Sequence, residues 1–213
     1  MPELITPQNI TLRTLKQTLG LTATASQNFF PEWHENLPAL SREEQVTLDR
    51  VQGNFLDLME DPPLLENTVK MVILAPLLDL AGLYRRPFRI TTEQSMSIDL
   101  EDEGILIQGR IDILVVRDYL WLVVIESKRS DFAVTRALPQ TLAYLLSNPK
   151  TSHPTFGLIT NGHEFLFVKA QRTPHAQYGT SRLFSLINPN AELYQVLAIL
   201  KRLTQEQHTG EGD

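Results

Sequence analysis

The chain has 213 residues, 42% of them hydrophobic, which is enough apolar material for one packed domain. Its formal net charge of −6 argues against a protein that coats nucleic acid through bulk positive charge, although it permits a local basic cleft. Because cysteine is absent, disulfides, a thiolate nucleophile and a cysteine zinc site are excluded. No apolar run approaches the roughly 20 residues that span a bilayer, and no signal peptide is evident. We therefore expect a cytoplasmic protein without a membrane partner.

Two amphipathic helices are expected near the N-terminus. Leucines recur at helical spacing over residues 8–19, which predicts a short helix. Ser41 is followed three residues later by Glu44, and this capping-box pattern predicts the start of a second helix. We therefore expect residues 1–63 to form a helical lead-in that packs on a domain of residues 64–213, as one globular unit.

A third helix is predicted over residues 64–81, where a wide apolar stripe indicates that it is largely buried. Pro76 lies within it and predicts a kink or a local loss of hydrogen bonding. Glu66 lies in the first turn, where the helix dipole favours a carboxylate. Taken alone, that dipole effect is sufficient to explain Glu66.

Three strands are predicted next, over residues 88–98, 105–116 and 120–127. Because tight turns separate them, we expect two consecutive hairpins, which form an antiparallel meander. A helix within residues 135–147 follows and begins near Leu138.

A second strand pair is predicted beyond that helix. Residues 155–160 read as a buried strand, Asn161-Gly162 is a strong hairpin signal, and residues 165–169 form the returning strand. We expect residues 171–181 to be a polar loop, and an amphipathic helix near the C-terminus completes the domain.

Three charged residues interrupt the apolar strands of the meander. Asp112 lies inside the second strand, and Glu126 and Lys128 close the third. Residues two apart share a strand face, so Glu126 and Lys128 point the same way, and Asp112 can lie beside them if the strands pair. Charges at the edge of an apolar core are costly unless they pair or hold a metal.

The order of these elements resembles the PD-(D/E)xK nuclease superfamily, whose core is an αβββαβ unit with a mixed central sheet flanked by helices. Within it, the chain resembles the N-terminal nuclease domain of type I restriction enzyme R subunits and their stand-alone relatives. The resemblance covers about residues 64–169 and lies in the phrases G-R-I-D at 109–112, I-E-S-K at 125–128 and I-T-N-G at 159–162. Gln140 and Tyr144 add a Q-x-x-x-Y pair like that of RecB-type nucleases.

The resemblance implies a metal-dependent endonuclease that hydrolyses DNA phosphodiester bonds, of restriction or DNA-processing type. Asp112 and Glu126 would hold Mg²⁺, which Mn²⁺ can replace, together with the backbone carbonyl of Ser127 and with Glu66 as a further ligand. Lys128 would orient the attacking water or stabilise the transition state. Neighbouring carboxylates keep a lysine protonated, so we favour the electrostatic role.

The same resemblance implies contacts with nucleic acid. Gln140 and Tyr144 would line the site and contact the scissile strand, and we expect Arg110 and Arg129 to contribute to DNA binding. DNA is the expected partner, and a separate motor or methyltransferase subunit is a further possible one. The sequence contains no G-x-x-x-x-G-K-[ST] loop, so an ATP site of that type is not expected.

Three alternatives remain open from the sequence. Glu126 could form an internal ion pair with Lys128 or Arg110 that only closes the sheet end. The domain could be a catalytically silent nucleic-acid-binding or assembly module that retains the nuclease fold. The apolar face of the C-terminal helix, over residues 193–203, could be a homodimer interface.

Overall fold

The computed structural model describes most of the chain, in segments. These are residues 3–5, 10–60, 66–100, 105–117, 120–126, 133–148, 153–188 and 191–205. For residues 3–5, 66, 93–100, 105–112, 116–117 and 120–126, the description covers the backbone and not the side chains.

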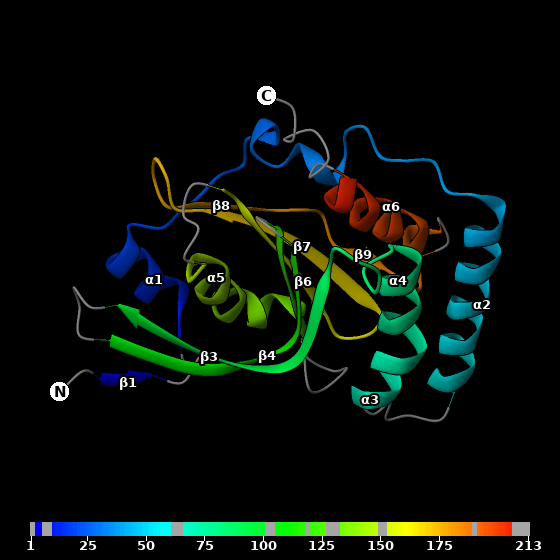
Figure 1. The fold of residues 1–213 in the computed structure, drawn as a ribbon, viewed down its shortest axis with the longest axis horizontal. Coiled ribbons are helices and arrows are strands. Elements are labelled where there is room, and N and C mark those ends of the chain that lie inside the picture. The colour runs from blue at the N-terminus through cyan, green and yellow to red at the C-terminus, as the bar shows by residue number, and fades with distance from the viewer. Residues whose placement is uncertain are drawn as a thin grey trace.

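A mixed β-sheet forms the centre of the molecule, with helices on both faces (Figure 1). Along the path β1-β4-β5-β6-β7-β8-β2 neighbouring strands are hydrogen-bonded, and in addition β3 pairs with β4 and β9 pairs with β7. The strands are β1 (Glu3–Ile5), β2 (Thr22–Ala23), β3 (Arg89–Leu100), β4 (Ile105–Arg117), β5 (Leu120–Glu126), β6 (Thr155–Thr160), β7 (Glu164–Gln171), β8 (Gln177–Thr180) and β9 (Phe184–Ser185).

The predicted antiparallel meander is confirmed, because β4 pairs antiparallel with both β3 and β5. β5 then pairs parallel with β6, and β6 pairs antiparallel with β7 through the predicted Asn161-Gly162 turn. A parallel pair requires a crossover, which is provided here by helix α5 (Leu138–Leu146). The mixed α/β sheet agrees with the predicted restriction-endonuclease-like core.

The polar loop predicted over residues 171–181 was wrong in part, because β8 lies within it. β8 pairs antiparallel with β7, from Val168 opposite Thr180 to Gln171 opposite Gln177. A ladder of backbone hydrogen bonds needs no apolar side chains, so a polar segment beside an existing strand can join a sheet without an apolar pattern of its own.

The N-terminal segment contributes strands as well as the predicted helices. β1 pairs parallel with β4, and β2 pairs parallel with β8, so both strands come from the first 25 residues of the chain. The remaining N-terminal elements are helices α1 (Leu12–Leu19) and α2 (Arg42–Met59) and two short 3₁₀ turns, η2 (Gln27–Phe29) and η3 (Pro31–Trp33). Ser41 and Glu44 form the predicted capping box at the start of α2.

The predicted buried helix consists of three consecutive parts: α3 (Glu66–Val69), a π-helical segment η4 (Lys70–Leu74) and α4 (Ala75–Leu80). Pro76 lies in the first turn of α4, where its missing N–H is tolerated. The π-helical segment ends directly before that turn, so the predicted local disturbance at Pro76 is confirmed.

Helices cover the two faces of the sheet unequally (Figure 1). Helices α1 and α5 cover one face, together with the 3₁₀ turn η6 (Val134–Ala137) and side chains such as Leu114 and Ile159. Helices α2, α4 and α6 (Glu192–Gln205) cover the other face with a larger cluster that includes Ile113 and Leu158.

The apolar face of α6 is buried within this larger cluster. Its residues Leu193, Val196, Leu197, Ile199, Leu200 and Leu203 are each at most 2% exposed. The prediction that this face forms a homodimer interface was therefore wrong, because the chain itself covers the face. Within the described residues, no helix combines the length and apolarity that crossing a membrane requires.

Candidate functional site

The β4 and β5 strands separate at the position of the predicted acidic residues. Their pairing runs from Arg117 opposite Leu120, beside the turn, to Ile113 opposite Val124. Asp112 is the next residue of β4 after the last pair, and Glu126 is two residues beyond Val124 and ends β5. Both predicted carboxylate positions thus lie at the open end of the hairpin, as the strand pattern predicted.

Each strand is held by a different neighbour where the two part. On β4, Ile111 and Ile113 on either side of Asp112 pair with β3. On β5, Glu126 stays paired with Thr160 of β6. The two carboxylate positions therefore belong to strands that keep different pairing partners beyond the end of the β4–β5 ladder.

Whether the two carboxylates can reach one ion depends on where the β4–β5 pairing ends. If the register continued, position 112 would lie opposite position 125, and position 126 opposite position 111. Residues opposite each other share a face and successive residues alternate, so positions 112 and 126 would then lie on opposite faces. The expectation that pairing of the two strands would place Asp112 beside Glu126 was therefore wrong, because the β4–β5 ladder has to end before these positions if both are to reach one ion.

The start of α5 lies at the same end of the sheet. Because α5 connects the parallel strands β5 and β6, it runs back along them and begins near the carboxyl end of β5. In open α/β sheets, such carboxyl ends are the usual place for a binding site. Gln140 is the third residue of α5, so the topology brings it toward the end that carries Glu126.

Gln140 and Tyr144 contact each other, as their spacing predicted. The Gln140 amide lies 3.4 Å from the Tyr144 hydroxyl, which accepts its hydrogen bond. Tyr144 has no exposed surface and is packed in the smaller core cluster, whereas Gln140 is half-buried. A direct contact with DNA thus remains a prediction for Gln140, and the burial of Tyr144 favours a role in orienting Gln140.

The helix that begins at Glu66 also reaches this end of the molecule. Val69, three residues after Glu66, lies against Gly162 in the turn that follows β6. Thr160, at the other side of that turn, is the pairing partner of Glu126. The backbone therefore brings the starts of α3 and α5 and the end of β5 to the same region, although their sequence separations are large.

Two glycines, one within β6 and one in the turn that follows it, were not predicted as site residues. A Cβ on Gly162 would lie 2.9 Å from each methyl group of Val69, and a Cβ on Gly157 would lie 2.8 Å from the Thr141 methyl group of α5. The I-T-N-G phrase at residues 159–162, which contributes to the family resemblance, includes Gly162 and could have indicated it. No pattern in the sequence distinguishes Gly157.

Several predicted site residues lie outside the described residues. Ser127, Lys128 and Arg129 are not described, and Arg110 is described by its backbone alone, as are the three carboxylate residues. Among the described side chains, no group of three or more His, Asp or Glu could hold a metal. The three carboxylate positions at this sheet end supply hard oxygen donors, which is the donor type that fits Mg²⁺.

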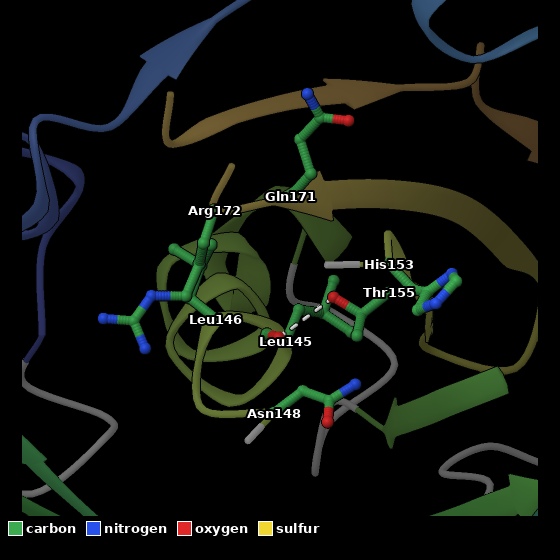
Figure 2. A pocket seen from close by; sticks show the side chains of 7 residues that line it. All are labelled: Leu145, Leu146, Asn148, His153, Thr155, Gln171 and Arg172. Carbon is green, nitrogen blue, oxygen red and sulfur yellow. Dashed lines mark hydrogen bonds between the residues drawn. The ribbon is translucent and has the colours of Figure 1, made fainter. Parts of the chain in front are cut away.

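A small pocket at the opposite end of β6 is separate from this site (Figure 2). Thr155 begins β6 and donates a 2.9 Å hydrogen bond to the carbonyl of Leu145, near the end of α5. Thr155 is five residues from Thr160, which is roughly 16 Å along a strand. The cavity volume is about 10 Å³, far below the ~300 Å³ at which small-molecule pockets begin. Its lining residues are Leu145, Leu146, Asn148, His153, Thr155, Gln171 and Arg172.

The comparison with protein families gives one match. A family model described as the type I restriction enzyme R protein N terminus matches residues 63–176, which is more than half of the chain. The matched range contains Glu66, Asp112 and Glu126. A search of curated proteins finds no match.

Proposed function

We propose, from the premise that the chain belongs to the family of type I restriction enzyme R protein N termini, that it is a Mg²⁺-dependent endonuclease that hydrolyses DNA phosphodiester bonds. Membership in the family makes it a restriction-enzyme-related, nuclease-like domain. The observation that carries the proposal beyond this is the separation of β4 and β5 directly between Asp112 and Glu126. A sheet that opens at two carboxylates is suited to hold a cation against a phosphate.

In this proposal the carboxylates of Asp112, Glu126 and Glu66 and the carbonyl of Ser127 hold the ion. When bound, Mg²⁺ supplies positive charge at the phosphate and lowers the pKa of water. Lys128 contributes a fixed positive charge, which stabilises the extra negative charge that develops on the phosphate when water attacks phosphorus. As attack proceeds, the new bond from the water oxygen to phosphorus forms and the ester bond to the leaving oxygen breaks. The attacking water releases a proton to solvent, and the leaving oxygen takes up one proton from solvent.

Gln140 has a binding role in this scheme. Its amide presents both a donor and an acceptor beside the site and is held by the buried Tyr144 hydroxyl. It can therefore position a DNA strand without taking part in the chemistry. Arg110 and Arg129 would add phosphate contacts, which carry most of the affinity for DNA and weaken as salt concentration rises.

The direct test is cleavage of plasmid DNA by the purified chain with Mg²⁺ or Mn²⁺. Asp112→Asn and Glu126→Gln should abolish cleavage, because each loses a charged ligand with little change in shape. Lys128→Met should lower kcat by about 10²–10³-fold, as expected for the loss of one group that stabilises transition-state charge. Asp57→Asn, which changes an exposed carboxylate on α2, should cleave at the wild-type rate.

Two results would oppose the proposal. Cleavage that survives Asp112→Asn would mean that another site or a contaminant is responsible. A wild-type chain that binds DNA and does not cleave it with either metal would instead support a catalytically silent binding module. Thermal stabilisation by Mn²⁺ separates these readings, because a binding module should show none that depends on Asp112 or Glu126.

We also propose that the chain acts on DNA together with a separate motor or methyltransferase subunit, because the matched family takes its name from the R protein of a multi-subunit restriction system. Addition of a motor subunit and ATP should then raise the cleavage rate. An identical rate with and without that subunit would oppose this part of the proposal.

A further inference from the structure

The turn between β6 and β7 is held in shape by its own side chains. The Thr160 hydroxyl accepts a hydrogen bond from the Gly162 N–H at 3.0 Å. The Asn161 side-chain oxygen accepts from the backbone N–H groups of His163 at 3.3 Å and Glu164 at 2.9 Å. Thr160 and Asn161 are buried, so these bonds are shielded from competing water. The turn therefore has a fixed shape against which a neighbouring helix can pack.

Gly162 allows an unusually close approach between this turn and α3. Its φ is +102°, a conformation that side chains rarely adopt, and a Cβ there would lie 2.9 Å from both methyl groups of Val69. Val69 is 4% exposed and belongs to the larger core cluster. The helix can therefore lie at this distance only if the turn presents a residue without a side chain.

A short series of contacts connects Gly162 to both acidic elements. Glu66 precedes Val69 by three residues, so the two are neighbours on one helix face, about 4.5 Å apart along the axis. On the other side of the turn, Thr160 is bonded to Gly162 and is paired with Glu126. The approach at Gly162 thus sets the spacing between the helix end that carries Glu66 and the strand end that carries Glu126.

We infer that Gly162 is a positioning residue of the carboxylate site, a role that rests on the proposed function. An added Cβ must move from 2.9 Å to the 3.4 Å of ordinary contact, so the helix or the turn has to shift by about 0.5 Å. Functional groups need to be held to about that precision. Either shift changes the distance between the Glu66 and Glu126 positions, because each position belongs to an element that meets at this contact.

The experiment is a set of glycine and valine variants measured by Mn²⁺ titration calorimetry and by cleavage kinetics. Gly162→Ala should weaken Mn²⁺ binding by about 10–100-fold, the range for residues that orient metal ligands. It should lower kcat and leave the KM for DNA within about twofold of wild type, because the DNA contacts are not displaced. Circular dichroism would verify the fold of each variant.

Gly82→Ala is the matched control for backbone strain. Gly82 has a φ of +75° and follows α4, yet a Cβ there would meet nothing within 4 Å. It should therefore lose stability from its positive φ while Mn²⁺ affinity stays at the wild-type value. Val69→Ala in the Gly162→Ala background removes both methyl groups, so it should recover most of the lost affinity.

The outcomes separate this inference from the proposed function. Wild-type protein without Mn²⁺ binding or cleavage overturns the proposed function, and the inference with it. Wild-type binding with a Gly162→Ala affinity within twofold of wild type, or with no recovery in the double variant, overturns the inference alone. If Gly162→Ala does not fold, Val69→Ile applies the same pressure from the helix side, and an unchanged Mn²⁺ affinity there is equally contrary.

Discussion

The two helical layers of the protein are assembled in different ways. On one face, α5 follows β5 and precedes β6 in sequence, so the crossover itself holds it beside its neighbours. It is buried along most of its length, from Leu138 to Leu146, and packing with the sheet accounts for its position. Few hydrogen bonds or ion pairs are needed to hold α5, because the chain connection already determines which strands it packs against.

The opposite layer brings together α2, α4 and α6 from distant parts of the chain, and an ion pair and a hydrogen bond join α6 to α2. Lys201 of α6 lies 2.5 Å from Glu44 of α2, and the Tyr194 hydroxyl donates to Asp49 at 2.5 Å. We interpret these contacts as selecting one arrangement among several that would bury the same apolar surface. We therefore expect the loss of a polar contact to lower the free energy of unfolding most on the face covered by α2, α4 and α6.

The largest effect should come from the buried ion pair Glu32–Lys169, which ties the N-terminal segment to β7. The two side chains are 7% and 10% exposed, and the ammonium of Lys169 also faces the rings of Phe29, Phe30 and Phe156. Lys169→Met leaves Glu32 buried without its partner, so urea unfolding should show a loss of about 3–5 kcal/mol.

The double variant Glu32→Leu/Lys169→Met gives the control for that prediction. It removes both charges, so most of the lost stability should return. Glu32→Leu alone completes the comparison. If the losses of the two single variants simply add in the double variant, the pair does not act as a unit, which contradicts the role given to polar contacts in this layer.

Glu192 should give the next largest effect, because it joins α6 to the segment before it. Its carboxylate accepts from Arg182 at 2.6 Å, from the Ser185 N–H at 2.6 Å and from Asn188 at 2.9 Å. Burial by itself raises the pKa of Glu192, but these hydrogen bonds outweigh burial and hold the pKa below its usual value. Glu192→Gln should therefore cost about 1.5–3 kcal/mol at neutral pH.

The pH dependence of Glu192 provides a second measurement. A carboxyl whose pKa is lower in the folded state stabilises the protein above the unfolded pKa of about 4.3, and this contribution is lost as pH falls through the folded pKa. Wild-type stability should therefore fall more steeply with acid than that of Glu192→Gln.

Gly157 tests how closely α5 packs against β6. Gly157→Ala forces a Cβ to within 2.8 Å of the Thr141 methyl group, and the Thr141 hydroxyl is fixed by its bond to the Ala137 carbonyl. Overpacking of this kind should cost about 1–3 kcal/mol in urea unfolding. Thr141→Ser removes the methyl group and keeps the hydroxyl, so the double variant should regain stability relative to Gly157→Ala. An unaltered loss in the double variant would mean that Thr141 is not the obstacle.

The smallest effect should come from the start of α2. Ser41→Ala removes the acceptor for the Glu44 N–H and should cost about 1 kcal/mol in thermal or urea unfolding. Ser26→Ala is the matched control, because Ser26 precedes a 3₁₀ turn without a side-chain cap bond. Equal losses in the two variants would show that the capping box contributes nothing beyond the substitution itself.

By itself, the sequence determined the features that depend on near neighbours. The capping box at Ser41, the three-strand meander, the Asn161-Gly162 turn and the disturbance at Pro76 all follow from local propensity and periodicity. The positions of Asp112 and Glu126 beside the open end of the β4–β5 ladder follow as well, because the length of a hairpin sets which residues reach its open end.

Only the tertiary structure decided which distant segments meet. The polar strand β8, the pairing of Glu32 with Lys169 and the contact of Gly162 with Val69 join residues without a shared local pattern. The C-terminal helix illustrates the reason most clearly. Its apolar face showed that it would be buried, but an apolar face does not specify its partner, and here the rest of the same chain covers it. The proposed site depends on both kinds of information, because local pattern supplies its carboxylates and long-range packing sets their spacing.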